Sequence, residues 1–206
     1  TLAAETKGGH VGWFLRKADG QLLRRFVDTN QDKKVDLWCY YKSGIEVYRD
    51  IDSNFNGKAD QYRWIGTGGT RWGIDRNGDQ KIDSWKTISA AELSQELVWA
   101  LKAADLGRFQ AILLSEVDLG KLELGGEFAA ALKQKRTESV AGFVELARRQ
   151  RMVTDSSRWV HFGGGIPGLV PAGSSGATRD MVVLDNSAAV VENGDQHSQL
   201  FVGSLV

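Results

Sequence analysis

A nine-residue acidic segment that occurs three times constrains this chain more than any other feature. The segments are residues 28–36, 52–60 and 75–83, and their starts lie 24 and 23 residues apart. Each follows the pattern D-x-N-x-[D/N]-x-x-x-D, with valine or isoleucine directly before it and an aromatic residue two positions after it. Self-similarity at a fixed period is typical of one supersecondary unit repeated in tandem.

A second type of turn lies between the acidic segments and predicts β-hairpins. These turns are Asp-Gly at 19–20, Ser-Gly at 43–44 and a Gly-rich stretch at 66–69. Gly accepts the positive φ that tight hairpin turns need. The segments between turns are rich in residues that favour strands, and the predicted strands are Trp13–Lys17, Leu22–Val27, Leu37–Lys42, Ile45–Ile51, Gln61–Ile65, Thr70–Ile74 and Ser84–Ile88. The simplest topology is an antiparallel β-meander with tight turns at one end and acidic loops at the other.

The acidic loops have the oxygen spacing of a calcium site. Calcium takes six to eight oxygen ligands at about 2.3–2.6 Å. Each loop offers side-chain oxygens at positions 1, 3, 5 and 9 and a backbone carbonyl at position 7. The predicted ligands are Asp28, Asn30, Asp32, Lys34 and Asp36; Asp52, Asn54, Asn56, Lys58 and Asp60; and Asp75, Asn77, Asp79, Lys81 and Asp83, where each lysine contributes its carbonyl.

The chain therefore carries up to three predicted calcium ions. The first and third loops bring three carboxylates each and the second brings two. Because ligand charge tunes calcium affinity, the middle site is predicted to be the weakest. The alternative is that the loops hold no metal, because Asp and Asn also stabilise turns by bonding to nearby backbone. Three repeats of one pattern, in register with flanking aromatics, favour the metal hypothesis.

These loops resemble EF-hand-type calcium loops of dockerins and thrombospondin type 3 repeats. They are more closely similar to a hairpin repeat of large exported bacterial proteins, with pattern D-x-[DN]-x-[DN]-G-x-x-D-x-W. The resemblance covers roughly residues 12–88 and is most specific at Tyr48–Gly57 and Arg71–Asp75. It implies one calcium site in each loop and an extracytoplasmic location, meaning secreted, periplasmic or at the cell surface.

The sequence departs from the EF-hand pattern at two loop positions. Position 12, a bidentate Glu in EF-hands, holds Cys39, Arg63 and Lys86. Position 6, which should be Gly for the sharp turn, is Gly only in the second loop, at Gly57. Lys33 and Gln80 must therefore adopt a left-handed or altered turn, at a cost of about 1 kcal/mol each.

Residues 89–151 are predicted to be helical. Ser89 and Glu92 match a capping box, and leucines at 93, 97 and 101 mark one face of a helix to about residue 104. Asp105 is placed to cap a second, short helix. A third helix is predicted from Glu127 to about Arg151, with Gly142 as a possible bend and an inner face of Phe128, Leu132, Val140, Phe143, Val144 and Ala147.

Strands are predicted again between residues 157 and 206. They are Arg158–Phe162, Leu169–Val170, Met181–Asp185, Ala188–Glu192 and Gln199–Val206, with turns at 186–187 and 193–195. The predicted class is α+β, with a β-hairpin repeat domain at 1–88 and an α+β domain at 89–206. The second domain faintly resembles the nuclear transport factor 2-like (NTF2-like) cone fold, truncated before its last strand, which implies a sheet curved around a pocket.

Composition excludes several function classes. Lys+Arg and Asp+Glu both number 26, so the chain has no basic excess for binding nucleic acid. The single cysteine, Cys39, allows no internal disulfide and no thiolate zinc cluster. The histidines at 10, 161 and 197 lack zinc-ligand spacing, and the Gly-rich stretch at 163–168 lacks a Walker lysine. No apolar run reaches the roughly 20 residues of a membrane-spanning helix.

These observations favour a calcium-binding structural or interaction module of an exported multidomain protein over an enzyme. The chain begins with Thr1 and ends on Val206 within a strand pattern, so we expect it to be a piece of a longer protein. Its expected partners are calcium and either another protein or an attached domain. The alternative is a small-ligand-binding or enzymatic domain that uses a pocket in the C-terminal part, lined by Trp159 and His161.

Overall fold

The computed structural model describes residues 2–7, 10–66, 69–174 and 176–206, and it confirms the α+β class. The chain forms two compact units, an N-terminal unit (Thr1–Ser89) and a C-terminal unit (Ala90–Val206), which are described separately. No helix among the described residues is long and apolar enough to cross a membrane.

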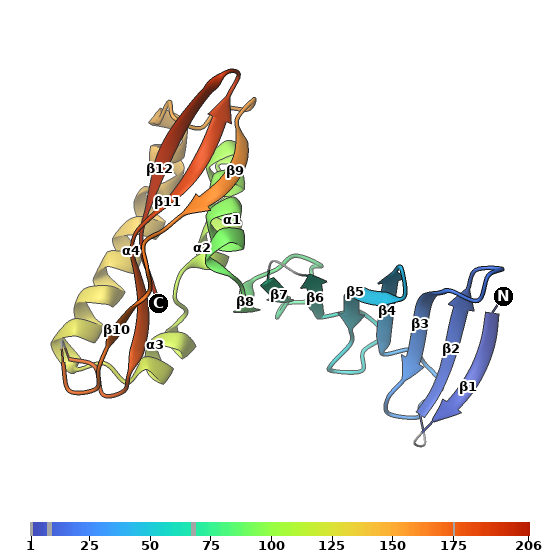
Figure 1. Ribbon diagram of the computed structural model, residues 1–206. Coiled ribbons are helices and arrows are strands. Elements are labelled where there is room, and N and C mark those ends of the chain that lie inside the picture. The colour runs from blue at the N-terminus through green and yellow to red at the C-terminus, as the bar shows by residue number, and fades with distance from the viewer. Residues whose placement is uncertain (1, 8–9, 67–68, 175) are drawn as a thin grey trace. The chain divides into compact units, whose positions relative to one another are not determined.

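The N-terminal unit is an eight-stranded antiparallel sheet whose strand order follows the chain (Figure 1). Its strands are β1 (Leu2–Lys7), β2 (His10–Arg16), β3 (Leu22–Asp28), β4 (Leu37–Lys42), β5 (Ile45–Ile51), β6 (Gln61–Gly66), β7 (Gly69–Ile74) and β8 (Ser84–Thr87). The predicted meander is confirmed. Strand β1 was not predicted, and the predicted turn at 66–69 includes residues 67 and 68, which lie outside the described residues.

Aromatic rings line one face of this sheet across several strands. Register pairs Tyr40 with Tyr48 and Tyr48 with Trp64, and their ring centroids lie 5.5 and 5.0 Å apart. The Arg71 guanidinium lies 4.9 Å from the Trp64 ring centroid and 4.7 Å from that of Trp85. Cross-strand aromatic pairs and stacked cations stabilise a pleated surface without a second layer.

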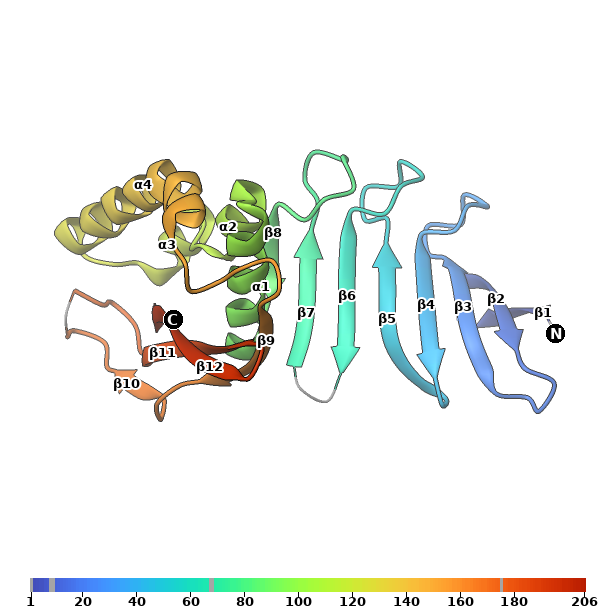
Figure 2. The ribbon, with the colours of Figure 1, turned by 90° about the horizontal axis from the view of Figure 1, so that it is seen from above.

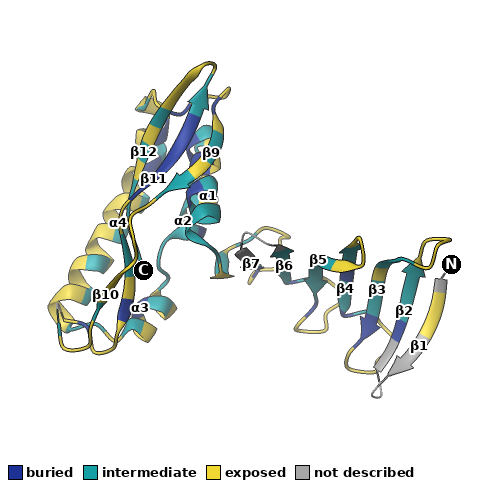
Figure 3. Cartoon of the chain, in the orientation of Figure 1, coloured by how far each residue is buried: buried dark blue, intermediate teal, exposed yellow. Residues whose placement is uncertain are grey.

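The opposite face of the sheet also has cations stacked on an aromatic ring, and it includes a buried cysteine. Arg63 stacks on Trp72 at 4.6 Å, and the Lys86 ammonium lies 3.6 Å from the same ring centroid. Cys39, in the middle of β4, is 2% exposed. Most described strand residues of the unit are half-buried, whereas its loops are largely exposed (Figure 3), so the sheet is held by cross-strand contacts on both faces.

The C-terminal unit packs four helices against a small antiparallel sheet. The helices are α1 (Ala90–Ala103), α2 (Leu106–Ile112), α3 (Glu116–Leu122) and α4 (Gly126–Arg149), and the strands are β9 (Arg158–Gly163), β10 (Gly168–Val170), β11 (Met181–Asn193) and β12 (Gln196–Leu205). Strand β11 pairs with β12 on one edge and with β9 and β10 on the other. Its buried stretch is dark blue in Figure 3.

The core of this unit joins α1, α4 and β11. Its fully or nearly buried members are Val98, Ala100, Leu101, Phe143, Ala147, Val153, Ala189 and Val191. Phe109 of α2 stacks on Phe143 of α4 with ring centroids 4.1 Å apart. This contact joins the short helix to the long one.

Several local predictions for this unit hold and others do not. Asp105 caps α2 by accepting from the Arg108 amide, as expected. Helix α3 was missed, and α4 continues through Gly142. The predicted turn at 186–187 is wrong: these residues form an irregularity within β11, where Asn186 has a φ of 53°. Phe128 is exposed, so it does not belong to the inner face of α4.

Candidate metal-binding loops

The three acidic loops connect β3 to β4, β5 to β6, and β7 to β8. Figure 2 shows all three at the same end of the sheet, as the meander requires. Each loop is closed by a backbone hydrogen bond from position 9 to the residue before position 1. The three bonds are Asp36 N to Val27 O (2.9 Å), Asp60 N to Ile51 O (2.9 Å) and Asp83 N to Ile74 O (2.8 Å).

Backbone amides wrap the aspartate at position 1 of each loop. Asp28 accepts from the Gln31 amide at 2.6 Å and the Lys33 amide at 2.8 Å. Asp75 accepts from the Gly78 and Gln80 amides, both at 2.7 Å. Asp52 accepts from Asn56 and Gly57 at 3.2 and 2.6 Å. The loop backbone therefore curls around this carboxylate in all three repeats.

Positions 3 and 5 form two successive side-chain turns. The oxygen at position 3 accepts from the amide of position 5, and the oxygen at position 5 accepts from the amide of position 7. The bonds are 2.8 to 3.1 Å long and involve Asn30, Asp32 and Lys34; Asn54, Asn56 and Lys58; and Asn77, Asp79 and Lys81. The carbonyls at position 7 accept no hydrogen bond from the described residues.

Position 9 is held from position 2. The Thr29 amide and hydroxyl both donate to Asp36 Oδ2 at 2.8 Å, and the Ser53 hydroxyl donates to Asp60. The third loop has Arg76 at position 2, so Asp83 receives an amide bond of 2.7 Å but no hydroxyl. The role of the hydroxyl at position 2 was not predicted from the sequence. The signal for it was a hydroxyl residue, Thr29 or Ser53, at the same position of two loops.

Two left-handed residues shape each loop. At position 6 the φ angles are 72° for Lys33, 88° for Gly57 and 67° for Gln80, which confirms the left-handed turn predicted there. Position 4 is left-handed as well, in residues 31, 55 and 78, and only the last of these is Gly. These turns point the amides of the loop at the position 1 carboxylate.

Burial separates the third loop from the other two. Asp28, Asp36, Asp52 and Asp75 are 1–2% exposed and Asp60 is 7% exposed, whereas Asp83 is exposed. No Lys, Arg or His lies within ion-pair distance of these five buried carboxylates in the described part of the chain. Buried charges are normally paired with a cation or coordinate a metal.

The donor set fits a hard cation but not a soft one. Each loop presents carboxylate, amide and carbonyl oxygens, with no thiolate or imidazole among the predicted ligands. No three His, Cys, Asp or Glu side chains converge on one metal position among the described residues. Any metal bound here would therefore depend on Asn and backbone oxygens as much as on carboxylates.

Acidic loops also affect the aromatic residues beside them. The Tyr62 hydroxyl donates to the Ala59 carbonyl at 3.1 Å. Burial, followed by the negative charges of Asp75, Asp50, Asp60 and Asp79, raises the pKa of Tyr62 above its usual value. The raised pKa of the Tyr62 phenol therefore reflects, in part, the negative charge of the second and third loops.

The C-terminal unit contains a separate cavity of about 280 Å³. Neither Trp159 nor His161 lines it. Trp159 packs against the core and donates its indole N–H to the Ser94 hydroxyl at 2.9 Å, while His161 is exposed. The two residues expected to line a pocket therefore have other positions.

Comparison of the chain with protein-family models, with curated proteins and with solved structures finds no match.

Proposed function

We propose that the N-terminal unit is a calcium-stabilised β-meander that serves as a structural or interaction module of an exported protein. The observation that carries the proposal is the set of five buried loop carboxylates without a cationic side-chain partner in the described chain. Backbone amides satisfy their hydrogen bonds but do not neutralise their charge. A divalent cation supplies that charge, and the flanking strands hold the loops that supply the oxygens.

The ligand set predicts weak sites. No bidentate Glu stands at position 12, so we expect dissociation constants of about 10⁻⁴–10⁻³ M, the range of extracellular modules. Such sites fill only where calcium is abundant, which favours an extracytoplasmic location. At calcium 100 times its dissociation constant, each site that binds only the folded state adds about 2.7 kcal/mol to the free energy of unfolding.

The experiment is thermal unfolding of the full chain in millimolar calcium, in magnesium and in chelator. We expect the melting temperature to rise in calcium and to fall in chelator. Asp28→Asn, Asp52→Asn and Asp75→Asn each remove one buried carboxylate with little change in shape, so each should reduce the calcium-dependent shift. Asp19→Asn is the matched control, because Asp19 stabilises a tight turn of the same sheet by accepting from the Gln21 amide at 2.9 Å.

Terbium luminescence gives a second, site-resolved measurement. Trp38 and Trp85 stand two residues after the first and third loops, so they should sensitise terbium bound there. Asp28→Asn should reduce the emission of the first site and Asp75→Asn that of the third. Identical melting curves in calcium and chelator, with no sensitised emission, would overturn the proposal.

A further inference from the structure

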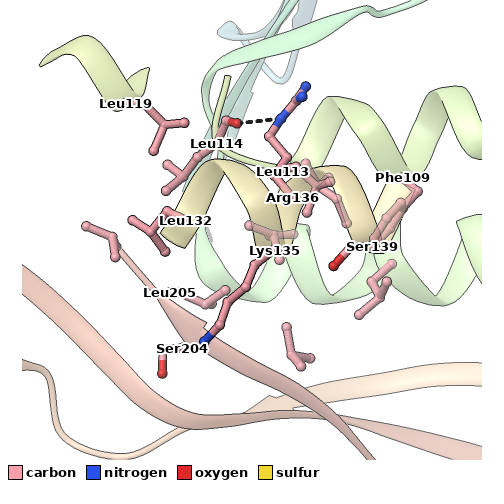
Figure 4. A pocket seen from close by; sticks show the side chains of 15 residues that line it. Phe109, Leu113, Leu114, Leu119, Leu132, Lys135, Arg136, Ser139, Ser204 and Leu205 are labelled. Carbon is pink, nitrogen blue, oxygen red and sulfur yellow. Dashed lines mark hydrogen bonds between the residues drawn. The ribbon is translucent and has the colours of Figure 1, made fainter. Parts of the chain in front are cut away.

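The cavity of the C-terminal unit has an apolar wall built from five elements. It is lined by Leu97 of α1, Phe109 of α2, Leu119 of α3, Leu132 of α4 and Leu205 of β12, among others (Figure 4). Its volume of about 280 Å³ lies just below the range of small-molecule sites, which is about 300–1,000 Å³. Such a wall favours an apolar ligand of modest size.

Two cations on α4 give the cavity a positive rim. Figure 4 shows the Lys135 amine beside Ser204 at one end, while Arg136 extends toward Leu114 at the other, where its Nε donates to the Leu114 carbonyl at 3.0 Å. Within the described ranges no carboxylate lies at ion-pair distance from either side chain. Lys133, on the same helix, does have a partner, since its amine lies 3.1 Å from Glu116.

One acidic residue stands near the rim. The Ser204 hydroxyl donates to Asp185 at 2.7 Å. Because Ser204 lines the cavity, this bond places the Asp185 carboxylate beside the lining, and its negative charge opposes anion binding at the Lys135 end. The Asp185 charge can be used to test which charge the ligand head carries. Removal of this charge should strengthen the binding of an anion and weaken that of a cation.

We propose that this cavity binds a single-chain amphiphile with an anionic head, namely an alkyl carboxylate of medium length. The alkyl chain packs against the leucines and Phe109, and the carboxylate lies at the Lys135 amine. Burial of the chain supplies most of the affinity, at about 25 cal/mol per Å² of apolar surface. The Lys135 ammonium, which lacks a carboxylate partner in the described chain, supplies preference for an anion over a neutral head.

The test is calorimetric titration of the full chain with decanoate below its micelle concentration. Decanol and decyltrimethylammonium serve as neutral and cationic probes of the same chain length. The titrations are made in chelator, so that calcium neither precipitates the carboxylate nor occupies the acidic loops. We expect decanoate to bind roughly tenfold more tightly than decanol, as a charged hydrogen bond would give.

The key variant is Lys135→Met, which keeps most of the unbranched side chain and removes its charge. It should weaken decanoate roughly tenfold and leave decanol unchanged. Lys133→Met, on the same helix but outside the lining, is the matched control and should leave both unchanged. Asp185→Asn should tighten decanoate binding, and Ser139→Phe, at an exposed position of the lining, should weaken both probes by filling the mouth.

The proposal fails if decanol and decanoate bind equally, or if Lys135→Met and Lys133→Met behave alike. It also fails if none of the three probes binds to a chain that unfolds cooperatively. A loss of calcium response in the loop experiments leaves it untouched, because the two sites lie in different units.

Discussion

At the scale of single residues, the loops depend on where the backbone amides point. Asp28 and Asp75 each accept two amide hydrogen bonds, and a hydrogen bond to a charged group contributes about 1.5–3 kcal/mol. Those amides are available only because positions 4 and 6 are left-handed. A residue other than Gly is strained in that conformation. The non-glycine residues at positions 4 and 6 therefore lower the stability of the loops.

Replacement of the non-glycine residues at position 6 should therefore stabilise the N-terminal unit. Lys33 and Gln80 hold φ angles of 72° and 67°, where an L-residue loses about 1–2 kcal/mol relative to Gly. Gly loses more entropy on folding, so we expect Lys33→Gly and Gln80→Gly each to add about 0.5–1 kcal/mol. Urea unfolding measures the change.

Gly57 supplies the opposite control for position 6. Its φ is 88° and a Cβ added there would meet nothing within 4 Å, so Gly57→Ala isolates the conformational cost. It should destabilise the unit by about 1 kcal/mol. A stabilising Gly57→Ala, or a destabilising Lys33→Gly, would show that the turns are not left-handed in solution.

Cys39 offers a chemical probe of the centre of the sheet. Burial, followed by the charge of Glu46, raises the pKa of its thiol to about 12. Because the thiolate is the reactive form, labelling by a disulfide reagent at pH 8 should be slow in the folded chain and fast in urea. A raised pKa favours the neutral thiol below that value, so labelling should accelerate as pH rises toward 12. If calcium stabilises the sheet, chelator should accelerate labelling at pH 8 as well.

At the scale of elements, backbone bonds connect the loops to one another. The amide of Asp52 donates to the Asp36 carbonyl, and the amide of Asp75 donates to the Asp60 carbonyl, both at 2.8 Å. Position 9 of one loop is thus bonded to position 1 of the next. Ordering one loop therefore favours the conformation its neighbour needs.

Position 8 of the third loop packs back onto the sheet through Gly73 of β7. A Cβ at Gly73 would lie 2.6 Å from Cδ1 of Ile82, so Gly73→Ala must displace that side chain. We expect a loss of about 1–3 kcal/mol, the usual cost of overpacking, together with weaker terbium emission from the third loop. Ile82→Val shortens the side chain at its δ-methyl and should restore part of the stability in the double variant. An additive double variant would mean that the two positions do not touch.

The elements that could be predicted were those with local signals. The turns, the acidic loops and the aromatic strands of the meander follow from spacing and from residue type. Strand β1 was missed because Leu2–Lys7 contains neither an aromatic residue nor more than one β-branched one, and only pairing with β2 orders it. The irregularity at 186–187 was taken for a turn because Asn-Ser is a local turn signal, whereas pairing on both edges keeps β11 continuous.

At the scale of the whole molecule, the two units are stabilised differently. The N-terminal unit relies on cross-strand rings, stacked cations and wrapped carboxylates, whereas the C-terminal unit has a hydrophobic core. The loop residues could be predicted because each loop is a single segment of nine consecutive residues, so its pattern is visible in the sequence. The cavity could not, because its lining comes from five elements between residues 93 and 206 and exists only once they pack.

The two units should therefore respond to different ligands. Hydrogen–deuterium exchange of the full chain, followed by mass spectrometry of peptides, resolves the units without separating them. Calcium should slow exchange in residues 22–87 and leave α1, α4 and β11 unchanged, since the core cluster draws only on the C-terminal unit. Decanoate should slow exchange in α4 and β12 and leave the acidic loops unchanged. Equal protection of both units by either ligand would mean that they fold as one cooperative body, because local stabilisation reaches a distant segment only when the two segments open together.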